Sequence, residues 1–218
     1  MILTALVGNT NTRLVWWTRG TVRARRILPT VRVLQCARVP GSSRPVKGVA
    51  IASVVPRATP VLARTLELAT NCSPFVLGPG TRVGLSFRYR RSQLGADRIC
   101  DAVGAWHLHH DNCIALDFGT AVTVNVVLAE GSFAGGLILP GPDLMLAGLA
   151  RSTALLPRVE LRRKLELIGR TTCAAIQAGV FHILACGLRG VIDEFERATS
   201  RSFRVVLTGG RAKLFYRA

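Results

Sequence analysis

Residues 114–128 read IALDFGTAVTVNVVL, and this stretch decides the fold. A short apolar run ends in an aspartate, a Gly-Thr-Ala turn follows, and a second run rich in β-branched residues comes next. This pattern predicts a β-hairpin. Residues 3–17 read LTALVGNTNTRLVWW and follow the same plan around a Gly-Asn-Thr turn. Its recurrence half a chain away indicates two related halves.

Helical patterns lie between and after these hairpins. Thr59-Pro60 offers an N-cap and a first-turn proline for the helix that follows. Residues 97–106 place their apolar side chains on one helical face, and a long helical pattern that contains many apolar residues follows Thr172 toward Phe195. Strands that alternate with helices predict an α/β architecture. Residues 20–48 show no pattern that assigns elements.

Composition indicates a globular chain. Of its 218 residues, 49% are hydrophobic and 19% charged, a mixture that can bury a core. No apolar run has the length needed to span a bilayer, and no charged leader precedes an apolar stretch at the first residues. We therefore expect a cytoplasmic protein without a membrane partner.

The charge is strongly basic, with a formal net charge of +17. Almost all basic residues are arginines, since only Lys47, Lys164 and Lys213 are lysines. A basic surface attracts phosphates. However, no RNP, zinc-finger or helix-turn-helix signature accompanies the charge, and no cysteines stand at CxxC spacing. Nucleic-acid binding is therefore not the predicted main role, although the charge does not exclude it.

Both predicted hairpin turns suit a phosphate. Glycine lets the backbone approach an anion, and hydroxyl and amide side chains supply donors without bulk. Residues 8–12, Gly-Asn-Thr-Asn-Thr, offer four such donors, and Gly119-Thr120 offers a smaller set. Each turn alone is also what an ordinary tight turn contains, so the structural interpretation stays open for either one.

Two carboxylates stand out. Asp97 opens a helix, where it either stabilises the helix dipole or acts as a general base toward an attacking hydroxyl. Asp117 ends an apolar strand, where a carboxylate needs a cation or donors, and cation binding is the better interpretation. Arg98 could hold a substrate carboxylate through its planar guanidinium.

These residues resemble the type III pantothenate kinases, a family of the actin/hexokinase-like ATPase superfamily. The resemblance rests on motifs that occur in the family's order over most of the chain. They are Val7–Asn11, Ser53–Pro56, Gly95–Arg98, Asp117–Ala121, Gly135–Gly141, Thr153–Pro157, Val159–Leu161, Ile168–Thr172 and Thr208–Gly210.

The resemblance implies a fold and an activity. The fold would be α/β, with two ribonuclease-H-like (actin-like ATPase) halves over residues 1–112 and 113–218 and a cleft between them. The activity would be transfer of the γ-phosphate of Mg²⁺-ATP to the primary hydroxyl of pantothenate, the first step toward coenzyme A. It also implies a requirement for a monovalent cation, K⁺ or NH₄⁺, and a homodimer that shares the pantothenate pocket.

The resemblance also implies roles for individual residues. Asp97 would accept the proton, and Asp117 would bind the monovalent cation. The implied ATP contacts are Leu6, Val7, Gly8, Asn9, Thr10, Asn11, Thr12, Arg13, Thr120, Thr208, Gly209 and Gly210. The implied pantothenate contacts are Tyr89, Gly95, Ala96, Asp97, Arg98 and Thr172.

One departure from the family's pattern bears on activity. The family has an aspartate directly before Val-Gly-Asn-Thr, and here that position is Leu6. Such an acid organises the metal and the phosphates, so its loss should lower activity. The alternative function is therefore a catalytically impaired homologue that serves as a nucleotide-binding or transcriptional accessory protein.

Overall fold

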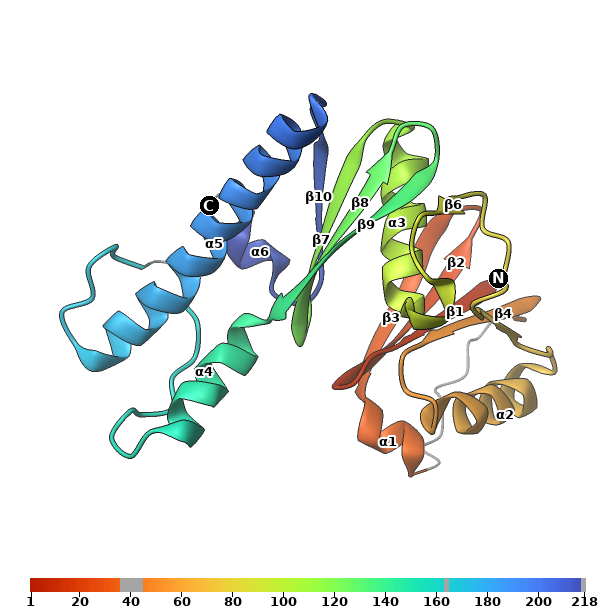
Figure 1. The fold of residues 1–218 in the computed structure, drawn as a ribbon. Coiled ribbons are helices and arrows are strands. Elements are labelled where there is room, and N and C mark those ends of the chain that lie inside the picture. Colours follow the sequence, from red (N-terminus) through yellow and green to blue (C-terminus); the bar gives the residue numbers. More distant parts are fainter. Residues whose placement is uncertain (36–44, 163–164, 217–218) are drawn as a thin grey trace. The chain divides into compact units, whose positions relative to one another are not determined.

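The computed structural model describes residues 1–35, 45–162 and 165–216; Figure 1 shows the fold. The chain divides into two compact units. Unit 1 comprises Met1–Val83 and Arg90–Cys100, and unit 2 comprises Gly84–Tyr89 and Asp101–Ala218. The sequence prediction placed the boundary at residue 112, so the division differs for residues 84–89 and 101–112, which cluster with the C-terminal part.

Unit 1 is built on a five-stranded sheet of order β3-β2-β1-β4-β5. Its strands are β1 (Ile2–Val7), β2 (Asn11–Thr18), β3 (Thr21–Pro29), β4 (Gly48–Ser53) and β5 (Phe75–Val76). The first three form an antiparallel meander, and β4 pairs with β1 in parallel. The predicted hairpin of residues 3–17 is confirmed. Strand β3 was not predicted, because its three arginines break the apolar pattern.

Two helices follow strands of unit 1, α1 (Thr30–Leu34) and α2 (Ala58–Thr70). Alternate residues of β1 and β2 pack in a core with Leu62 and Leu66 of α2. The predicted N-cap at Thr59 is wrong, because α2 begins at Ala58 with Arg57 at the cap. The Thr59 hydroxyl instead bonds Ser53 Oγ at 2.8 Å, which ties the helix to the end of β4.

Unit 2 repeats this plan. Its sheet has the order β10-β7-β8-β9-β6. The strands are β6 (Ser86–Phe87), β7 (Cys113–Phe118), β8 (Ala121–Leu128), β9 (Ser132–Pro140) and β10 (Arg204–Thr208). Strands β7, β8 and β9 form a meander, and β10 pairs with β7 in parallel. Both units thus place a parallel strand beside the first strand of a meander, which confirms the predicted repeat and α/β class.

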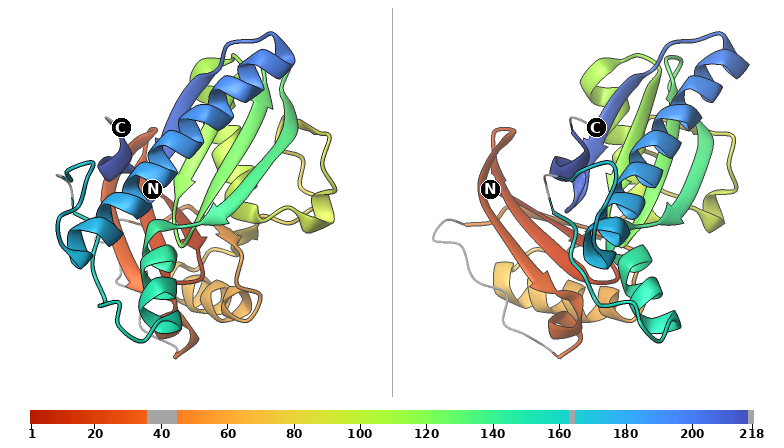
Figure 2. Two further views of the ribbon diagram at one scale, coloured as in Figure 1. Left: turned by 60° about the vertical axis from the view of Figure 1, so that its left-hand side comes forward. Right: turned by 90° about the vertical axis from the view of Figure 1, so that its left-hand side faces the viewer.

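Helices cover both faces of the unit 2 sheet. The remaining elements are η1 (Arg91–Gln93), α3 (Ala96–His109), α4 (Pro142–Ser152), α5 (Thr172–Thr199) and α6 (Ala212–Phe215). Helices α4 and α5 pack on the face that carries Ile114 and Leu116, and Figures 1 and 2 show α5 running along that sheet. On the other face Ala105 of α3 packs on Cys113 and Ala115.

Helix α5 is exceptional among the described helices for its length. It has 28 residues and, by length and composition alone, would suffice to cross a bilayer. However, Val180, Leu184 and Leu188 pack into the unit 2 core. One face of α5 is therefore that of an ordinary core helix.

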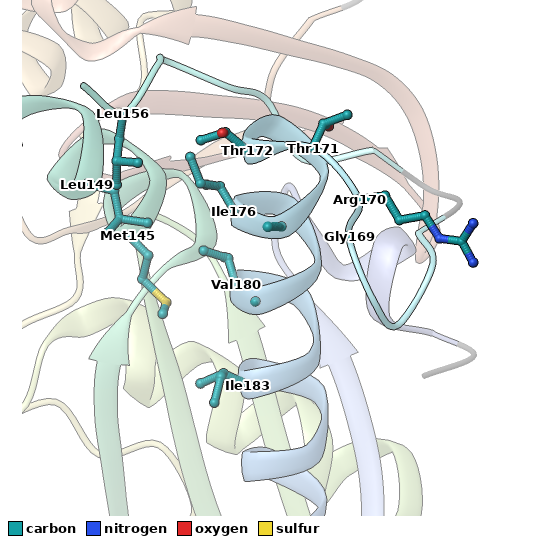
Figure 3. A pocket seen from close by; sticks show the side chains of 12 residues that line it. Met145, Leu149, Leu156, Gly169, Arg170, Thr171, Thr172, Ile176, Val180 and Ile183 are labelled. Atoms are coloured by element: carbon teal, nitrogen blue, oxygen red, sulfur yellow. The ribbon is translucent and has the colours of Figure 1, made fainter.

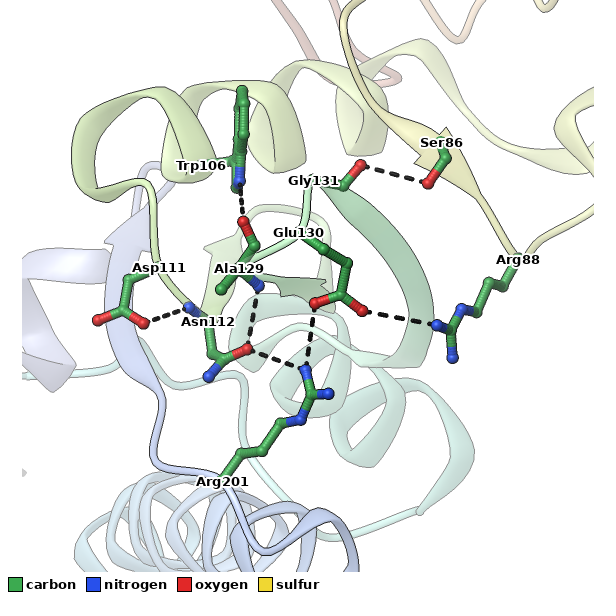
Figure 4. A network of polar contacts seen from close by, with 9 residues as sticks. All are labelled: Ser86, Arg88, Trp106, Asp111, Asn112, Ala129, Glu130, Gly131 and Arg201. Carbon is green, nitrogen blue, oxygen red and sulfur yellow. Dashed lines mark hydrogen bonds and ion pairs between the residues drawn. The ribbon is translucent and has the colours of Figure 1, made fainter.

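A polar network holds the end of unit 2 where α3 stops and the β8–β9 turn lies (Figure 4). Asn112 Oδ1 accepts from Ala129 N at 3.0 Å, and the Trp106 indole donates to Ala129 O at 3.2 Å. Glu130 pairs with Arg88 and Arg201. A hydrogen bond from its own backbone and these guanidinium groups lower the pKa of the Glu130 carboxyl. The network fixes unit 2 and contains none of the predicted site residues.

Candidate active site

One edge of the unit 1 sheet gathers the first predicted phosphate motif. Strands β1 and β4 are parallel and in register, with Val7 opposite Ser53, so both end at the same edge. The turn Gly8–Asn11 follows β1 and the turn Val54–Pro56 follows β4. Val54 N donates to Val7 O at 3.0 Å, which joins the two turns directly.

A buried threonine pair shapes the Gly8–Asn11 turn. Thr30, at the start of α1, donates from Oγ1 to Gly8 O at 2.6 Å, and its backbone N–H donates to Thr10 O at 2.9 Å. Its hydroxyl also lies 3.1 Å from Thr12 Oγ1. Gly8 N closes the turn on Asn11 O at 3.0 Å. The two threonines therefore fix the turn on its buried side, while the Asn9 and Asn11 side chains are exposed. No sequence signal pointed to Thr30.

The start of α3 brings Asp97 to the second of these turns. A Cβ built on Gly95 would lie 3.3 Å from Val54 Cγ1 and 2.5 Å from Asp97 Oδ1. Glycine at 95 therefore leaves room for the Asp97 carboxylate beside the Ser53–Pro56 turn. Asp97 is half-buried, and its Oδ1 accepts from Arg98 N at 2.7 Å. Arg98 itself is buried. Unit 1 thus places Asp97 and the turn after β4 together.

Leu6 occupies the position where the family carries an aspartate. Alternation along β1 sends Leu3, Ala5 and Val7 into the core, so Leu6 lies half-buried on the opposite face. Its cross-strand partner on β2 is Arg13. The Arg13 side chain therefore stands opposite position 6, where an aspartate would otherwise be its partner. The only acids of unit 1 are Glu67 and Asp97.

In unit 2 the Asp117 carboxylate faces a glycine turn. Strands β7 and β10 are parallel and pair Asp117 with Thr208. A Cβ on Gly209 would overlap Asp117 Oδ1 and would lie 2.6 Å from the Phe118 backbone, and Gly209 has a φ of +96°. Only glycine suits that position. The structure therefore brings Asp117 together with Thr208 and Gly209.

Two further turns lie at the edge of the unit 2 sheet where β7 and β10 end. Gly141 N donates to Thr120 O at 3.0 Å, and a Cβ on Gly141 would overlap the Gly119 and Thr120 backbone. Arg211 N donates to Phe118 O at 3.1 Å. The Arg211 side chain makes a two-pronged pair with Asp143, both bonds at 2.8 Å. That hydrogen bonding raises the pKa of Arg211. Sequence reasoning missed Gly141, Arg211 and Asp143 as residues that shape the site, although Gly141 lies in a family motif.

Thr172 lies at an open pocket of about 810 Å³ in unit 2 (Figure 3). The pocket runs between α4 and the first half of α5, and its floor is apolar. Thr171 caps α5 by accepting from Ala174 N at 3.2 Å, so the adjacent Thr172 begins the helix at the pocket mouth. The lining residues are Met145, Leu149, Leu156, Gly169, Arg170, Thr171, Thr172, Ala175, Ile176, Gly179, Val180 and Ile183.

The predicted pantothenate residues are divided between the units, and Tyr89 falls in unit 2 with Thr172. Gly95–Arg98 belong to unit 1. The Tyr89 ring packs edge-on against Phe133 with centroids 5.9 Å apart, and Gly135 leaves room beside it. This packing gives Tyr89 a structural role in unit 2.

The polar groups at the two sheet edges suit different ligands. The Asp117 carboxylate, with the room that Gly209 leaves beside it, offers oxygen ligands that suit a hard cation. The Gly8–Asn11 turn offers amides and hydroxyls without a neighbouring acid, which suits phosphate oxygens. Within the described ranges, no group of three or more His, Cys, Asp or Glu side chains could hold a metal ion.

Comparison with solved structures defines the class. A putative Baf family transcriptional activator from Campylobacter jejuni matches with a TM-score of 0.60 and 19% identity, over 98% of this chain and 85% of that one. A putative 2-dehydro-3-deoxygalactonokinase from Sinorhizobium meliloti matches with a TM-score of 0.53 and 14% identity, over 100% and 96%. These matches show that the chain has the α/β fold of actin/hexokinase-like ATPases, with one such half in each unit.

Sequence comparison defines the family. The sequence model of type III pantothenate kinase matches residues 2–194. The chain is also 37% identical over 170 residues to the type III pantothenate kinase of Moorella thermoacetica, covering 78% of this chain and 67% of that one. The chain therefore belongs to the type III pantothenate kinase family. The reaction of this family is ATP-dependent phosphorylation of pantothenate, at the start of coenzyme A biosynthesis, with ATP used as its Mg²⁺ complex.

Proposed function

We propose that this chain phosphorylates pantothenate in the cytoplasm with Asp97 as the general base, despite the leucine at position 6. The observation that carries the proposal is the placement of Asp97 beside the turn after β4, in the space that Gly95 leaves. A positioned carboxylate can take the proton of the attacking hydroxyl. Mass spectrometry of a mixture of protein, Mg²⁺-ATP and pantothenate tests this: phosphopantothenate supports the proposal, and its absence with folded protein contradicts it.

Binding of ATP is assigned to both units separately. In unit 1, Leu6–Arg13 would contact ATP, with the backbone N–H groups and the Asn9 and Asn11 side chains as donors to phosphate oxygens. In unit 2, Thr120 and Thr208–Gly210 would contact ATP. Bound Mg²⁺ neutralises phosphate charge during phosphoryl transfer. Arg13, opposite Leu6, supplies fixed positive charge at the first turn.

Asp117 is the proposed ligand of a monovalent cation, K⁺ or NH₄⁺. The support is its position at the end of β7, facing the space beside Gly209. Gly95, Ala96 and Arg98 would line the pantothenate site in unit 1, with the Arg98 guanidinium as the partner of the pantothenate carboxylate. Tyr89 and Thr172 would contribute from unit 2.

A homodimer is proposed through the α4–α5 face of unit 2. Ile183 on α5 is 67% exposed although it lines the pocket that also contains Thr172. Leu155, Leu167 and Ile168 are exposed as well. An open apolar face of this kind is covered at low cost by a second copy of the chain. The second copy would then complete the pocket at Thr172.

Ile183→Lys should convert the dimer into a monomer and raise the KM for pantothenate, because a buried unpaired charge is costly at an interface. Sedimentation velocity and steady-state kinetics measure the two effects. Leu68→Lys is the matched control, since Leu68 on α2 is 69% exposed and the substitution there should change neither. A wild-type chain that sediments as a monomer, or an Ile183→Lys variant that remains a dimer, would rule out this interface.

Thr30→Val should loosen the Gly8–Asn11 turn. The substitution keeps the shape but leaves the Gly8 carbonyl without its 2.6 Å donor, at a cost of about 1–3 kcal/mol. We expect a lower thermal midpoint and a several-fold higher KM for ATP with little change in the KM for pantothenate. Thr65→Val is the control, because Thr65 Oγ1 only bonds Val61 O within α2. Equal KM values for ATP in wild type and Thr30→Val would contradict the role of the turn.

A further inference from the structure

The two units carry very different charges. Unit 1 has 15 arginines and lysines against two acids, Glu67 and Asp97, for a net +13, so unit 2 carries only the remaining +4 of the total of +17. No acid precedes Glu67 in the sequence. A preference for arginine codons would explain arginine in place of lysine, but it does not explain the missing acids. Such asymmetry between halves indicates an anionic partner for one of them.

Much of this charge lies on the hairpin of β2 and β3. Of its five arginines, Arg19, Arg23, Arg25 and Arg26 are exposed and Arg13 is half-buried; we call this element the arginine hairpin. Arg26 pairs with Leu14 and Arg25 pairs with Val15. Because neighbouring residues of a strand point to opposite faces, these two arginines lie on opposite faces of the hairpin. Strand β3 is an edge strand of its sheet. Within the described residues, none of the four arginines is paired with an acid.

ATP binding does not account for this charge. The proposed phosphate turn precedes Asn11, the first residue of β2, whereas the hairpin tip is the Arg19-Gly20 turn after Thr18. With a rise of about 3.3 Å per residue, the two ends of β2 lie ~23 Å apart. Lys47, before β4, is exposed at the same edge as the tip, since Gly48 pairs with Ile2 and Ile2 with Trp17. The tip therefore belongs to an edge remote from the phosphate turn.

We propose that the arginine hairpin is a binding surface for duplex DNA, read through its phosphates. A guanidinium matches phosphate geometry with two parallel hydrogen bonds, and the hairpin forms the edge of its sheet, where the backbone of a duplex can approach it. The hairpin exposes no large aromatic side chain for base stacking, because Trp16 is buried and the Trp17 indole is bonded to Thr4 Oγ1. Binding is therefore independent of sequence and sensitive to salt. Within unit 1, the tip of this hairpin lies at the edge of the sheet remote from the phosphate turn.

Fluorescence anisotropy with a labelled duplex tests the proposal. If the four arginines each neutralise a phosphate, log K falls with log salt with a slope steeper by about 3 to 4 than without them. Replacing Arg19, Arg23, Arg25 and Arg26 by glutamine should remove that part of the slope and weaken binding at least about tenfold near 50 mM salt. The double variant Arg19→Gln, Arg23→Gln should lose about half of that part of the salt slope. Kinase activity and thermal midpoint should not change.

The control removes the same charge elsewhere. Arg151, Arg158, Arg162 and Arg189 are exposed in unit 2, and their replacement by glutamine should leave most of the DNA affinity intact. Equal loss in the two fourfold variants would overturn the proposal in favour of diffuse attraction. Failure of the wild type to bind duplex at low salt would also overturn it. So would binding to phosphatidylglycerol vesicles without DNA binding. Precipitation of the hairpin variant without loss of DNA binding would show that the arginines protect an edge strand.

Discussion

Asp97→Asn should lower kcat about 10²- to 10⁴-fold, the range that a positioned general base contributes. Asparagine has the shape of aspartate and keeps an oxygen for the 2.7 Å bond from Arg98 N, so α3 should begin as before. The amide cannot accept the proton of the pantothenate hydroxyl. ATP binding, measured by calorimetry, should be unchanged, because the substitution acts on proton transfer.

Glu67→Gln provides the control for Asp97→Asn. Glu67 is the other acid of unit 1 and forms an exposed pair with Arg64 at 3.0 Å. Pairs of this kind contribute little, so both kcat and thermal midpoint should remain near the wild-type values. A kcat for Asp97→Asn within about threefold of wild type would exclude Asp97 as the base, because general-base catalysis contributes far more.

Gly209→Ala should reduce kcat/KM for ATP at least about 100-fold, because displacement of a site group by about 1 Å can have that effect. The new methyl group would overlap Asp117 Oδ1 and crowd the Phe118 backbone. It must therefore displace the carboxylate that we assign to the monovalent cation. Activation by K⁺ should be weakened in the same variant, which a titration of rate against K⁺ concentration measures.

Gly104→Ala is the control for Gly209→Ala, because it adds the same methyl group at a position where nothing lies in its way. Gly104 lies within α3, and a Cβ there meets nothing within 4 Å. Alanine favours a helix interior by about 1 kcal/mol over glycine, so the variant should be at least as stable and as active as wild type. If Gly209→Ala keeps wild-type kinetics and the wild-type response to K⁺, the assignment of Asp117 fails.

The periodicity of apolar residues was sufficient to predict the helices and strands that have regular side-chain patterns. The two hairpins and the helices that begin at Ala96 and Thr172 could be predicted because apolar residues recur with the period of their element. Strand β3 could not, since an exposed edge strand has no buried face to set a pattern. Nor could the start of α2 be placed correctly, because Thr59 bonds Ser53 across a turn instead of capping the helix.

The site was predictable where motifs carry chemistry and not where distant residues support it. Asp97, Asp117 and Gly209 could be chosen as candidates from the sequence because each stands in a short motif. Thr30 was missed because its contact with Gly8 spans 22 positions and follows from the packing of α1. The cluster Arg23–Arg26 is visible in the sequence, but its place on an edge hairpin was not, because strand β3 was not predicted.

The central claim is that this chain is an active kinase with leucine at position 6, and the most direct test is its turnover beside that of Leu6→Asp. We measure phosphopantothenate formed from Mg²⁺-ATP with and without K⁺. We expect K⁺-dependent turnover by the wild type and a higher rate in Leu6→Asp, where the new carboxylate faces Arg13 across the strands. Folded wild-type protein that forms no product, while Leu6→Asp does, would contradict the claim and show a site silenced at one position.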